Sequence, residues 1–407
     1  MPSIFSKIVA GEIPCHRVWE DEEHLAFLDI QPLSTGHTLV IPKREEDYLF
    51  DLSEHRAQAL WRSAHQVAQV LKSKLGCARV AVLVLGYEVA HAHIHLIPCE
   101  TEAAVLSPQR QATDHEALAL LAAQLRGDQE VSPLLNTEEL ESRWDDFATR
   151  FVTQVEHTSL KVACAAIEHL QLTGVGSVLE VGCGGGAAGG ELRKRLAQRS
   201  PTAELVLTDL SQEMLRITET RLQSEVESSS VQTRIERADA QDLPYADASY
   251  DRYFSCLNLM LLPDPRAALT EAYRVLKPDG LGVWVVWGRP EYSAMMSLLP
   301  KTLKQLGINM PVPARSNFHL GGADTLIELA KFVGFTKCRR WYQPMHTELE
   351  RGEDFAEMTL NLRPELKDLV GTEQIKELRA RLASNAQAHL DEGEAIGLDT
   401  LILVARK

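Results

Sequence analysis

Hydrophobic and polar positions follow two different periods along the first part of the chain. Residues 24–30, 37–42, 79–85 and 89–97 are rich in β-branched and aliphatic side chains and are bounded by turn residues, so each predicts a strand. Residues 53–75 instead repeat apolar side chains every three or four positions, begin at a serine that can cap a helix and stop before a glycine. We therefore expect one helix packed across a small sheet.

The pattern changes after residue 127. Residues 116–126 still have helical spacing and are expected to close a first domain, residues 1–127. Residues 128–140 contain serine, proline and asparagine with few apolar anchors, which predicts a linker.

A second domain is expected over residues 141–407, where apolar runs of strand length alternate with helical spacing. Residues 144–170 predict a long helical stretch that is expected to cover the ligand cleft of this domain, and the alternation continues to about residue 287. Such alternation is typical of the α/β class and of a doubly wound, Rossmann-like parallel sheet. Residues 289–398 precede a final strand at 400–405 and are expected to form a lid over an acceptor pocket.

Composition narrows the possible functions. With 45% hydrophobic and 24% charged residues, the 407-residue chain is of ordinary globular composition, which excludes a disordered or fibrous protein. The net charge of −15 and the absence of a Lys/Arg run argue against a partner of duplex nucleic acid. No signal-peptide core or membrane-spanning run is present, so we expect a cytoplasmic protein with no membrane partner. Seven scattered cysteines without a Cys-x-x-Cys pair predict free thiols.

A glycine cluster follows the apolar run at residues 178–181. Gly182, Gly184 and Gly186 lead into a segment of helical spacing at residues 191–197. Because a loop without Cβ atoms lets a ligand lie against its backbone, and a helix N-terminus offers unpaired N–H groups, the pattern predicts a nucleotide-like cofactor. Glycine spacing alone does not distinguish NAD from S-adenosylmethionine (SAM). The acidic Asp209, at the end of the next strand, suits a ribose in either case.

Further sequence motifs favour SAM over NAD as the cofactor. Glu180 precedes the glycines, and residues 237–245, 249–251 and 273–280 follow in a characteristic order and spacing. Over residues 141–407 the chain resembles the class I SAM-dependent methyltransferases, especially the branch with the ubiquinone and menaquinone C-methyltransferases.

The resemblance implies roles for individual residues. Glu180 would face the amino end of the methionine moiety, Asp209 would bind the ribose hydroxyls, and Asp239 the adenine amino group beside the Ala240 backbone. Leu210 and Met214 would flank the adenine or ribose. The full set of expected cofactor-binding residues is Glu180, Gly182, Gly184, Gly186, Asp209, Leu210, Asp239, Ala240 and Cys256. The methyl acceptor is expected to be a small molecule that the sequence does not identify.

The strand expected at residues 89–97 carries a second chemical signal. His91, His93 and His95 recur with the two-residue period of a strand, so the three imidazoles are expected on one face. Neutral imidazoles bind zinc, but three successive residues on one face are poorly placed around a single ion. A row of imidazoles is better suited to a phosphate, since one ring can attack phosphorus while its neighbours donate hydrogen bonds.

Together with residues 4–14 and 36–43, this strand resembles the histidine triad family of nucleotide-binding hydrolases and transferases. The resemblance implies that His93 forms a nucleotidyl-imidazole intermediate and that His91 and His95 orient it and the α-phosphate. Asp29 would bind the ribose of a purine nucleotide, and His37 would add an imidazole near the phosphate.

Two departures from the family pattern bear on the chemistry. Ser6 replaces a cysteine that binds zinc in many members, so no metal is expected. Glu88 replaces the serine that would protonate a leaving amine, which puts phosphoramidate hydrolysis in doubt. Glu88 is expected, with Asp29, to be part of the nucleotide-binding site. Many triad proteins dimerise, so a homodimer is a further expectation.

The sequence therefore predicts a bifunctional protein, with an α+β histidine triad domain followed by a methyltransferase. Two alternatives stay open. The triad domain could bind nucleotides with little turnover and gate the methyltransferase, or both domains could act on one nucleotide-linked substrate such as a capped RNA.

Overall fold

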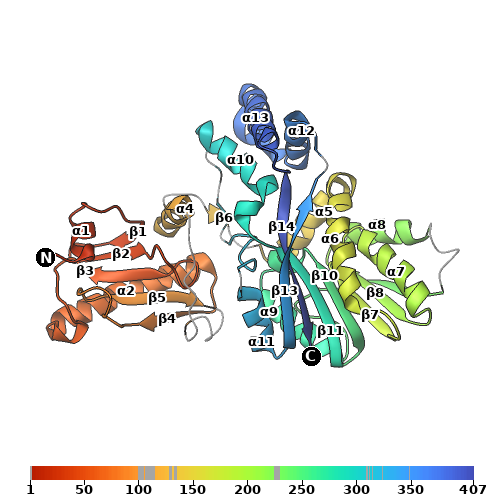
Figure 1. Ribbon diagram of the computed structural model, residues 1–407, viewed down its shortest axis with the longest axis horizontal. Helices are drawn as coiled ribbons and strands as arrows, with labels where there is room; N and C mark the ends of the chain where they lie inside the picture. The colour runs from red at the N-terminus through yellow and green to blue at the C-terminus, as the bar shows by residue number, and fades with distance from the viewer. Residues whose placement is uncertain are drawn as a thin grey trace. The chain divides into compact units, whose positions relative to one another are not determined.

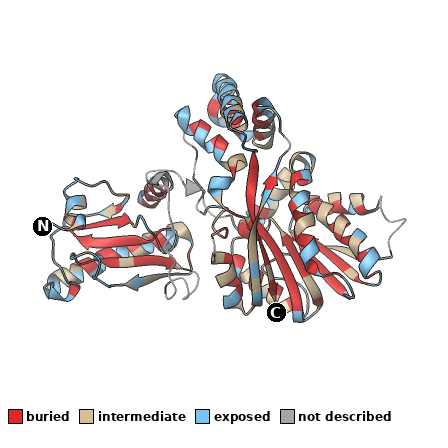
Figure 2. Cartoon of the chain, viewed as in Figure 1, coloured by how far each residue is buried: buried red, intermediate tan, exposed pale blue. Residues whose placement is uncertain are grey.

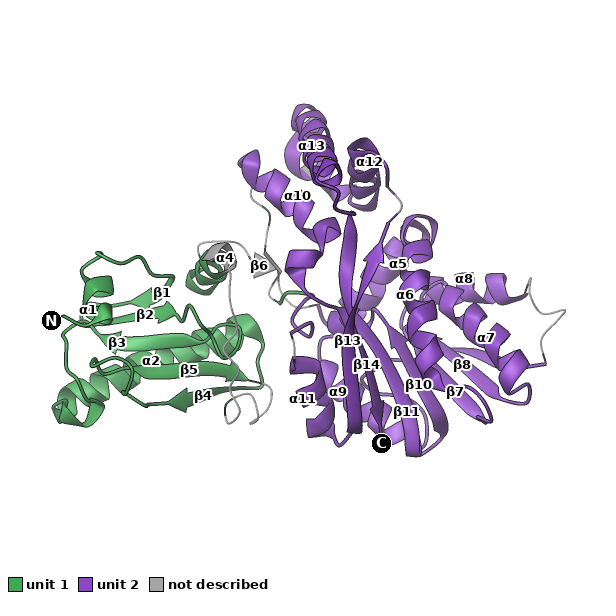
Figure 3. Ribbon diagram, viewed as in Figure 1, with its two compact units in different colours: residues 1–134, 310–316 green, residues 135–309, 317–407 purple. Residues whose placement is uncertain are grey.

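The computed structural model describes residues 2–99, 105, 115–127, 131–132, 135–223, 230–308, 310, 312–313, 315–322, 324–347 and 349–407. These residues form two compact units, residues 1–134 with 310–316 and residues 135–309 with 317–407 (Figure 3). Part of the expected linker, residues 128–140, lies outside the described residues. Its last residues begin a helix, since Asn136 and Glu139 form a reciprocal capping box at the start of α5 (Thr137–Gln154).

The first unit is built on a five-stranded antiparallel sheet of order β1-β2-β3-β5-β4 (Figure 1). Its elements are α1 (Ile4–Val9), β1 (Arg17–Glu20), β2 (His24–Leu28), β3 (Thr38–Pro42), η1 (Leu49–Asp51), α2 (Glu54–Leu75), β4 (Arg79–Leu83), β5 (Ile94–Cys99) and α4 (His115–Arg126), followed by the short parallel pair β6 (Val131–Ser132) and β12 (Val312–Pro313).

Both faces of β2 and β3 are buried. On one face, Leu60, Ala64, Val67 and Leu71 of α2 pack on alternate strand residues such as Val40. On the other face, Phe5 of α1 packs against the intervening residues, including Leu39 and Ile41. α2 ends at Gly76, whose φ of 65° lies in the left-handed region that glycine adopts readily.

The strand expected at residues 89–97 begins only at Ile94. The reason is that the preceding backbone bonds elsewhere: the His91 N–H donates to the Val89 carbonyl and the Ala92 N–H donates to the Glu46 carbonyl. His91 and His93 therefore lie in the segment that precedes β5, and of the three histidines only His95 is part of the ladder, where it pairs with Leu39.

The second unit is a seven-stranded sheet of order β13-β14-β11-β10-β7-β8-β9. Its strands are β7 (Ser177–Val181), β8 (Glu204–Asp209), β9 (Gln232–Arg237), β10 (Tyr250–Cys256), β11 (Leu276–Trp287), β13 (Thr336–His346) and β14 (Gly397–Arg406). All neighbours are parallel except that β14 runs antiparallel to β11 and β13. The expected fold class, an α+β domain followed by a Rossmann-like sheet, is confirmed.

Helices cover both faces of this sheet. One core lies under α6, α7 and α8, and the other lies under α9 and α11. The helical elements after α5 are α6 (Glu156–Ile167), η2 (Glu168–Leu170), α7 (Ala187–Arg199), α8 (Gln212–Gln223), η4 (Leu259–Leu261), α9 (Pro265–Val275), η5 (Pro290–Tyr292), α10 (Ala294–Gln305), α11 (Thr325–Val333), α12 (Gly352–Leu362) and α13 (Glu365–Asp391). Burial follows the strands and the inward sides of the helices (Figure 2).

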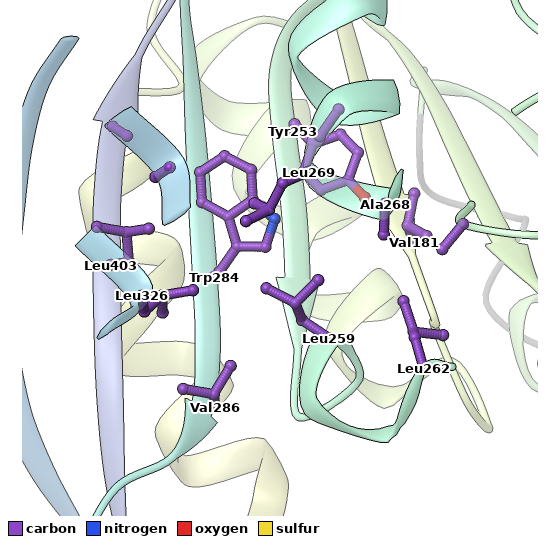
Figure 4. Packing of buried hydrophobic residues seen from close by; sticks show 14 of the residues in the cluster. Val181, Tyr253, Leu259, Leu262, Ala268, Leu269, Trp284, Val286, Leu326 and Leu403 are labelled. Carbon is purple, nitrogen blue, oxygen red and sulfur yellow. The ribbon is translucent and has the colours of Figure 1, made fainter. Parts of the chain in front are cut away.

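The largest buried side chain of the second unit is Trp284 on β11, which lies beside Tyr253 of β10 with ring centroids 5.4 Å apart (Figure 4). Room for it comes from Gly282, since a Cβ there would lie 2.0 Å from the indole. This packing joins β10 and β11, whose carboxyl ends lie near the cofactor loop.

The segment expected as a lid, residues 289–398, has two parts. α11 and β13 belong to the sheet layers, whereas α10, α12 and α13 pack on one another as a separate helical group. Among the described residues, no helix combines the length and apolar character needed to cross a bilayer.

Replacing Phe254 by alanine should destabilise the second unit. Phe254 lies on β10, is fully buried and packs in the core beneath α6 and α7. We expect F254A to lower the free energy of unfolding by about 3–5 kcal/mol, measured by denaturant titration of the whole chain. The matched control is F332A on α11, where the phenylalanine is 53% exposed; equal losses for both variants would contradict the assigned core.

Candidate functional sites

A pocket opens at the carboxyl ends of β7, β8 and β10, where ligands bind in doubly wound sheets. Eight of the nine expected cofactor-binding residues line it: Glu180, Gly182, Gly184, Asp209, Leu210, Asp239, Ala240 and Cys256. The ninth, Gly186, stands behind the lining as the N-cap of α7. The structure thus brings together residues that are up to 76 positions apart in the chain, and their roles stay predictions.

The glycine loop is shaped by the end of β8. The N–H groups of Gly182 and Cys183 both donate to the Thr208 carbonyl, at 2.8 and 2.9 Å, and the Gly184 N–H donates to Asp209 Oδ2 at 2.8 Å. Gly182 has a φ of 74°, and a Cβ there would lie 2.5 Å from the Asn258 side chain. The loop therefore tolerates no larger residue at position 182.

Four carboxylates line the pocket, those of Glu156, Glu180, Asp209 and Asp239. Glu180 is buried, and its Oε2 atom has no hydrogen-bond partner among the described residues. Burial raises the pKa of Glu180 to about 8, and the nearby Asp209 and Glu156 add to the shift. Burial also raises the pKa of Asp209, although it accepts backbone hydrogen bonds. Asp239 accepts from the Gln241 N–H at 2.9 Å.

No lysine or arginine is found among the described residues that line this pocket. An orphaned carboxylate oxygen and a lining without basic side chains suit a cationic ligand. These features fit SAM, whose ammonium and sulfonium groups are positive and whose carboxylate can be met by backbone N–H groups at the start of α7. Ala187 and Ala188 in that first turn line the pocket.

Helix α5 supplies an aromatic wall. Trp144 and Phe151 line the pocket and stand perpendicular, with centroids 5.9 Å apart. Asp145, on the same helix, accepts hydrogen bonds from the Ser211 hydroxyl at 2.5 Å and the Glu213 N–H at 3.1 Å, which ties α5 to α8. The helical spacing of residues 144–170 had indicated such a cover.

Sequence reasoning missed the ion pair behind the loop. Glu156, a buried pocket residue on α6, accepts two hydrogen bonds from Arg221 of α8, at 2.9 and 2.6 Å. Arg221 also donates to the Gly185 carbonyl at 2.5 Å. The pair braces the glycine loop. Because its members are 65 positions apart, no local pattern in the sequence could have revealed it.

The first unit gathers the predicted histidines beside the sheet. The His93 ring lies 4.9 Å from the His95 ring, and the His37 ring lies 5.2 Å from His95. His93 Nδ1 is 2.6 Å from the His91 carbonyl, an acceptor only, so Nδ1 carries the proton and Nε2 carries the lone pair. The lone pair of the middle imidazole therefore lies at Nε2, where the predicted role of nucleophile requires it.

The proton positions on His37 and His95 follow in the same way. The Leu33 N–H donates to His37 Nδ1 at 3.2 Å, so His37 Nε2–H donates to His95 Nδ1 at 3.0 Å. That leaves the His95 proton on Nε2. Burial, reinforced by His93 and His37, lowers the pKa of His95 to about 4. Near pH 7 this imidazole is a neutral hydrogen-bond donor.

The two residues expected to bind nucleotide lie near this row. Asp29 Oδ2 is 3.4 Å from His37 Nδ1, while Glu88 is exposed and acts electrostatically on His95. Ligand atoms of Asp29, His37 and His95 also fall within 4.8 Å of one another, a spacing that a metal ion could use. Hydrogen bonds already engage both nitrogens of His37, so the arrangement is explained without one.

Comparisons with known proteins find a family match in each unit of the chain. A family model described as a HIT domain matches residues 10–102, and one described as a methyltransferase domain matches residues 179–283. An uncharacterised HIT-like protein of Methanocaldococcus jannaschii is 41% identical over 100 residues, which are 23% of this chain and 77% of that protein. An adenosine 5′-monophosphoramidase of Schizosaccharomyces pombe is 36% identical over 107 residues, 25% of this chain and 77% of that protein.

Among solved structures, a Haemonchus contortus phosphoethanolamine N-methyltransferase with bound S-adenosylhomocysteine is 18% identical. The match covers 61% of this chain and 52% of that one, with a TM-score of 0.36, which does not bear on function. Both family resemblances expected from the sequence are confirmed. The chain therefore belongs to the histidine triad family through its first unit and carries a methyltransferase domain in its second.

Proposed function

We propose that the second unit transfers a methyl group from SAM to a small-molecule acceptor, while the first unit binds a purine nucleotide and transfers or hydrolyses its nucleotidyl group. The observation that carries the first part is the buried, unpartnered Glu180 oxygen in a pocket whose described lining has no basic side chain. A cationic cofactor satisfies that oxygen.

The chain's own residues bind and orient. SAM supplies a methyl group bonded to a positively charged sulfur. Glu180 pairs with its ammonium group, Asp209 accepts from the ribose hydroxyls, and Asp239 accepts from the adenine amino group. Trp144 and Phe151 exclude water from the same pocket. Because methyl transfer is an in-line displacement, alignment of the two reactants can supply much of the acceleration without a general base.

The acceptor side of the pocket is apolar. Leu140, Leu261 and Leu262 line it together with the α5 aromatics. This supports a small, largely apolar acceptor rather than a phosphorylated one, since a phosphate would find no cationic side chain among the described lining residues.

The nucleotidyl step follows from the proton positions in the first unit. His93 Nε2 attacks the α-phosphorus, an N–P bond forms, and the P–O or P–N bond to the leaving group breaks. His95 Nε2–H donates a hydrogen bond to a phosphate oxygen. Water then attacks phosphorus, the N–P bond breaks, and the nucleoside monophosphate leaves while imidazole is regenerated.

One observation favours the regulatory alternative. A leaving group needs a proton, yet His95 has a pKa of about 4 and Glu88 is exposed to solvent. A His95 with so low a pKa is not an effective acid near pH 7. A triad unit that binds nucleotide, turns it over slowly and alters methylation is therefore the second candidate.

SAM binding should weaken as the pH falls below about 8. Glu180 holds a proton in the ligand-free protein up to that pH, and pairing with the SAM ammonium requires the carboxylate, so binding releases a proton. We expect Kd to rise toward about tenfold per pH unit lowered, measured by calorimetry at several pH values below 8. E180Q should bind more weakly with a flat profile. A flat profile in the parent would contradict the assigned pairing.

The class of methyl acceptor can be read from label transfer. Methyl-labelled SAM is incubated with the protein and host extract, and the label is separated into organic-soluble and macromolecular fractions. We expect organic-soluble counts, because the lining is apolar. The control D209A should transfer almost none, since it lacks the expected ribose ligand. Macromolecular counts that nuclease releases would overturn the small-acceptor proposal in favour of a nucleotide-linked substrate.

Replacing His93 by alanine should abolish the covalent nucleotidyl intermediate trapped by acid quench. Turnover should fall by about a hundredfold or more, because no other group supplies the nucleophile. H55A, which removes an exposed histidine at the start of α2, is the matched control and should be unchanged. If the parent shows no turnover, yet nucleotide changes the methylation rate in both the parent and H93A, the regulatory candidate replaces the hydrolytic one.

A further inference from the structure

The side chains of Ser3, Ser6 and Glu45 gather around His91, the first histidine of the triad. Ser3, at the N-cap of α1, places its Oγ 2.9 Å from His91 Nδ1. Ser6, one turn later, donates its hydroxyl to Glu45 Oε2, and the Ser3 N–H donates to the same carboxylate oxygen at 2.8 Å. The four residues Ser3, Ser6, Glu45 and His91 form one hydrogen-bonded set, the His91 cluster.

The Pro42 carbonyl, which can only accept, determines which groups of the His91 cluster donate their hydrogen bonds. His91 Nε2 lies 2.7 Å from the Pro42 carbonyl, so Nε2 carries the proton and Nδ1 is an acceptor. Ser3 must then donate its hydroxyl to Nδ1. The Ser3 oxygen in turn accepts from the Ser6 N–H at 3.0 Å, which directs the Ser3 proton toward the histidine. Burial lowers the pKa of His91, which agrees with a neutral ring.

The position of His91 matters because its carbonyl orients His93. That carbonyl is the acceptor for His93 Nδ1–H, the bond that leaves Nε2 as the nucleophile. Yet His91 precedes β5, which begins at Ile94, so the sheet ladder does not hold it. Its backbone is held instead by Val89 and, through the Ala92 N–H, by the Glu46 carbonyl. Side-chain contacts of the imidazole must supply the remaining constraint.

Helix α1 packs on the imidazole rings of His91 and His93. Phe5 lies edge-on to His91 and His93, with centroid distances of 5.8 and 5.3 Å. Ser3 and Ser6 flank it on the same six-residue helix, and Glu45 ties both serines to the chain segment that follows β3. The His91 cluster therefore fastens α1 over the triad.

We propose that Ser3, Ser6 and Glu45 are positioning residues for nucleotidyl transfer, acting through His91 to hold the tautomer and direction of His93. This inference rests on the proposed function of the first unit. None of the three side chains needs to touch the nucleotide. Loss of any one should impair the chemical step more than nucleotide binding.

The test measures the proton positions directly. Ring ¹⁵N chemical shifts of His91 and His93 are recorded for the parent, S3A, S6A and E45Q, all as the full chain, and kcat and KM for nucleotide hydrolysis are measured alongside. In S3A we expect His91 to keep its Nε2 proton, which the Pro42 carbonyl accepts, while its Nδ1 shift moves and its pKa rises because Nδ1 has lost the Ser3 donor. We expect His93 to shift toward a mixture of tautomers. For S3A and E45Q we expect kcat to fall on the order of tenfold with little change in KM.

Two matched variants make the result decisive. S3T keeps a hydroxyl at the same atom and should restore the parent shifts and kcat. S73A removes an exposed serine of α2 that bonds only locally and should change neither. Circular dichroism shows whether each variant folds, and S6A substitutes for S3A if that variant does not. Parent-like histidine shifts in folded S3A and E45Q would overturn the proposal.

The experiment distinguishes a failure of the positioning role from a failure of the hydrolytic function. If the parent hydrolyses no nucleotide, the hydrolytic function fails, but the ¹⁵N shifts still decide whether the His91 cluster sets the tautomer of His93. If hydrolysis is normal in the parent and in all three variants, the positioning role fails while the hydrolytic function stands.

Discussion

The carbonyl of Thr208 and the carboxylate of Asp209 set the shape of the cofactor site. Together they accept three successive N–H groups of the glycine loop, those of Gly182, Cys183 and Gly184. Gly182 and Gly184 adopt positive φ values in this loop, and a Cβ on Gly182 would collide with the Asn258 side chain. Glu180 is buried beside this loop, its Oε2 atom has no hydrogen-bond partner among the described residues, and the first turn of α7 lines the pocket. The proposed preference for a cationic cofactor rests on that enclosure.

In the first unit, as in the second, backbone groups determine the state of the site residues. Main-chain groups that can only donate or only accept determine where the imidazole protons lie. The Leu33 N–H and the carbonyls of Pro42 and His91 leave one consistent assignment for His37, His91, His93 and His95. A side chain with two possible tautomers becomes a defined nucleophile or donor because rigid backbone surrounds it. Burial lowers the pKa values of His91 and His95, because it disfavours their charged forms.

Much of both sites could be predicted from the sequence because their residues lie in short strings. The glycine loop, the acidic ends of β8 and β9 and the histidine row each occupy fewer than ten consecutive positions. Contacts between distant segments could not be predicted. The Glu156–Arg221 brace and the Ser3–Glu45 contact join residues about 40 to 65 positions apart, and each residue alone resembles an ordinary surface charge or helix cap. The start of β5 was misplaced because strand pattern continues through His91, while its backbone bonds to a neighbouring loop.

The sequence by itself determined the two families, the order of the domains, the cofactor loop and the likeness of the histidine row to a phosphate site. These follow from local periodicity and from residue types whose chemistry is independent of context. Only the tertiary structure decided which groups are charged and where the protons lie. Protonation depends on burial and on the nearest donor or acceptor, as Glu180 and His95 show with pKa values moved in opposite directions by the same loss of water. Such surroundings exist only after distant segments have packed together.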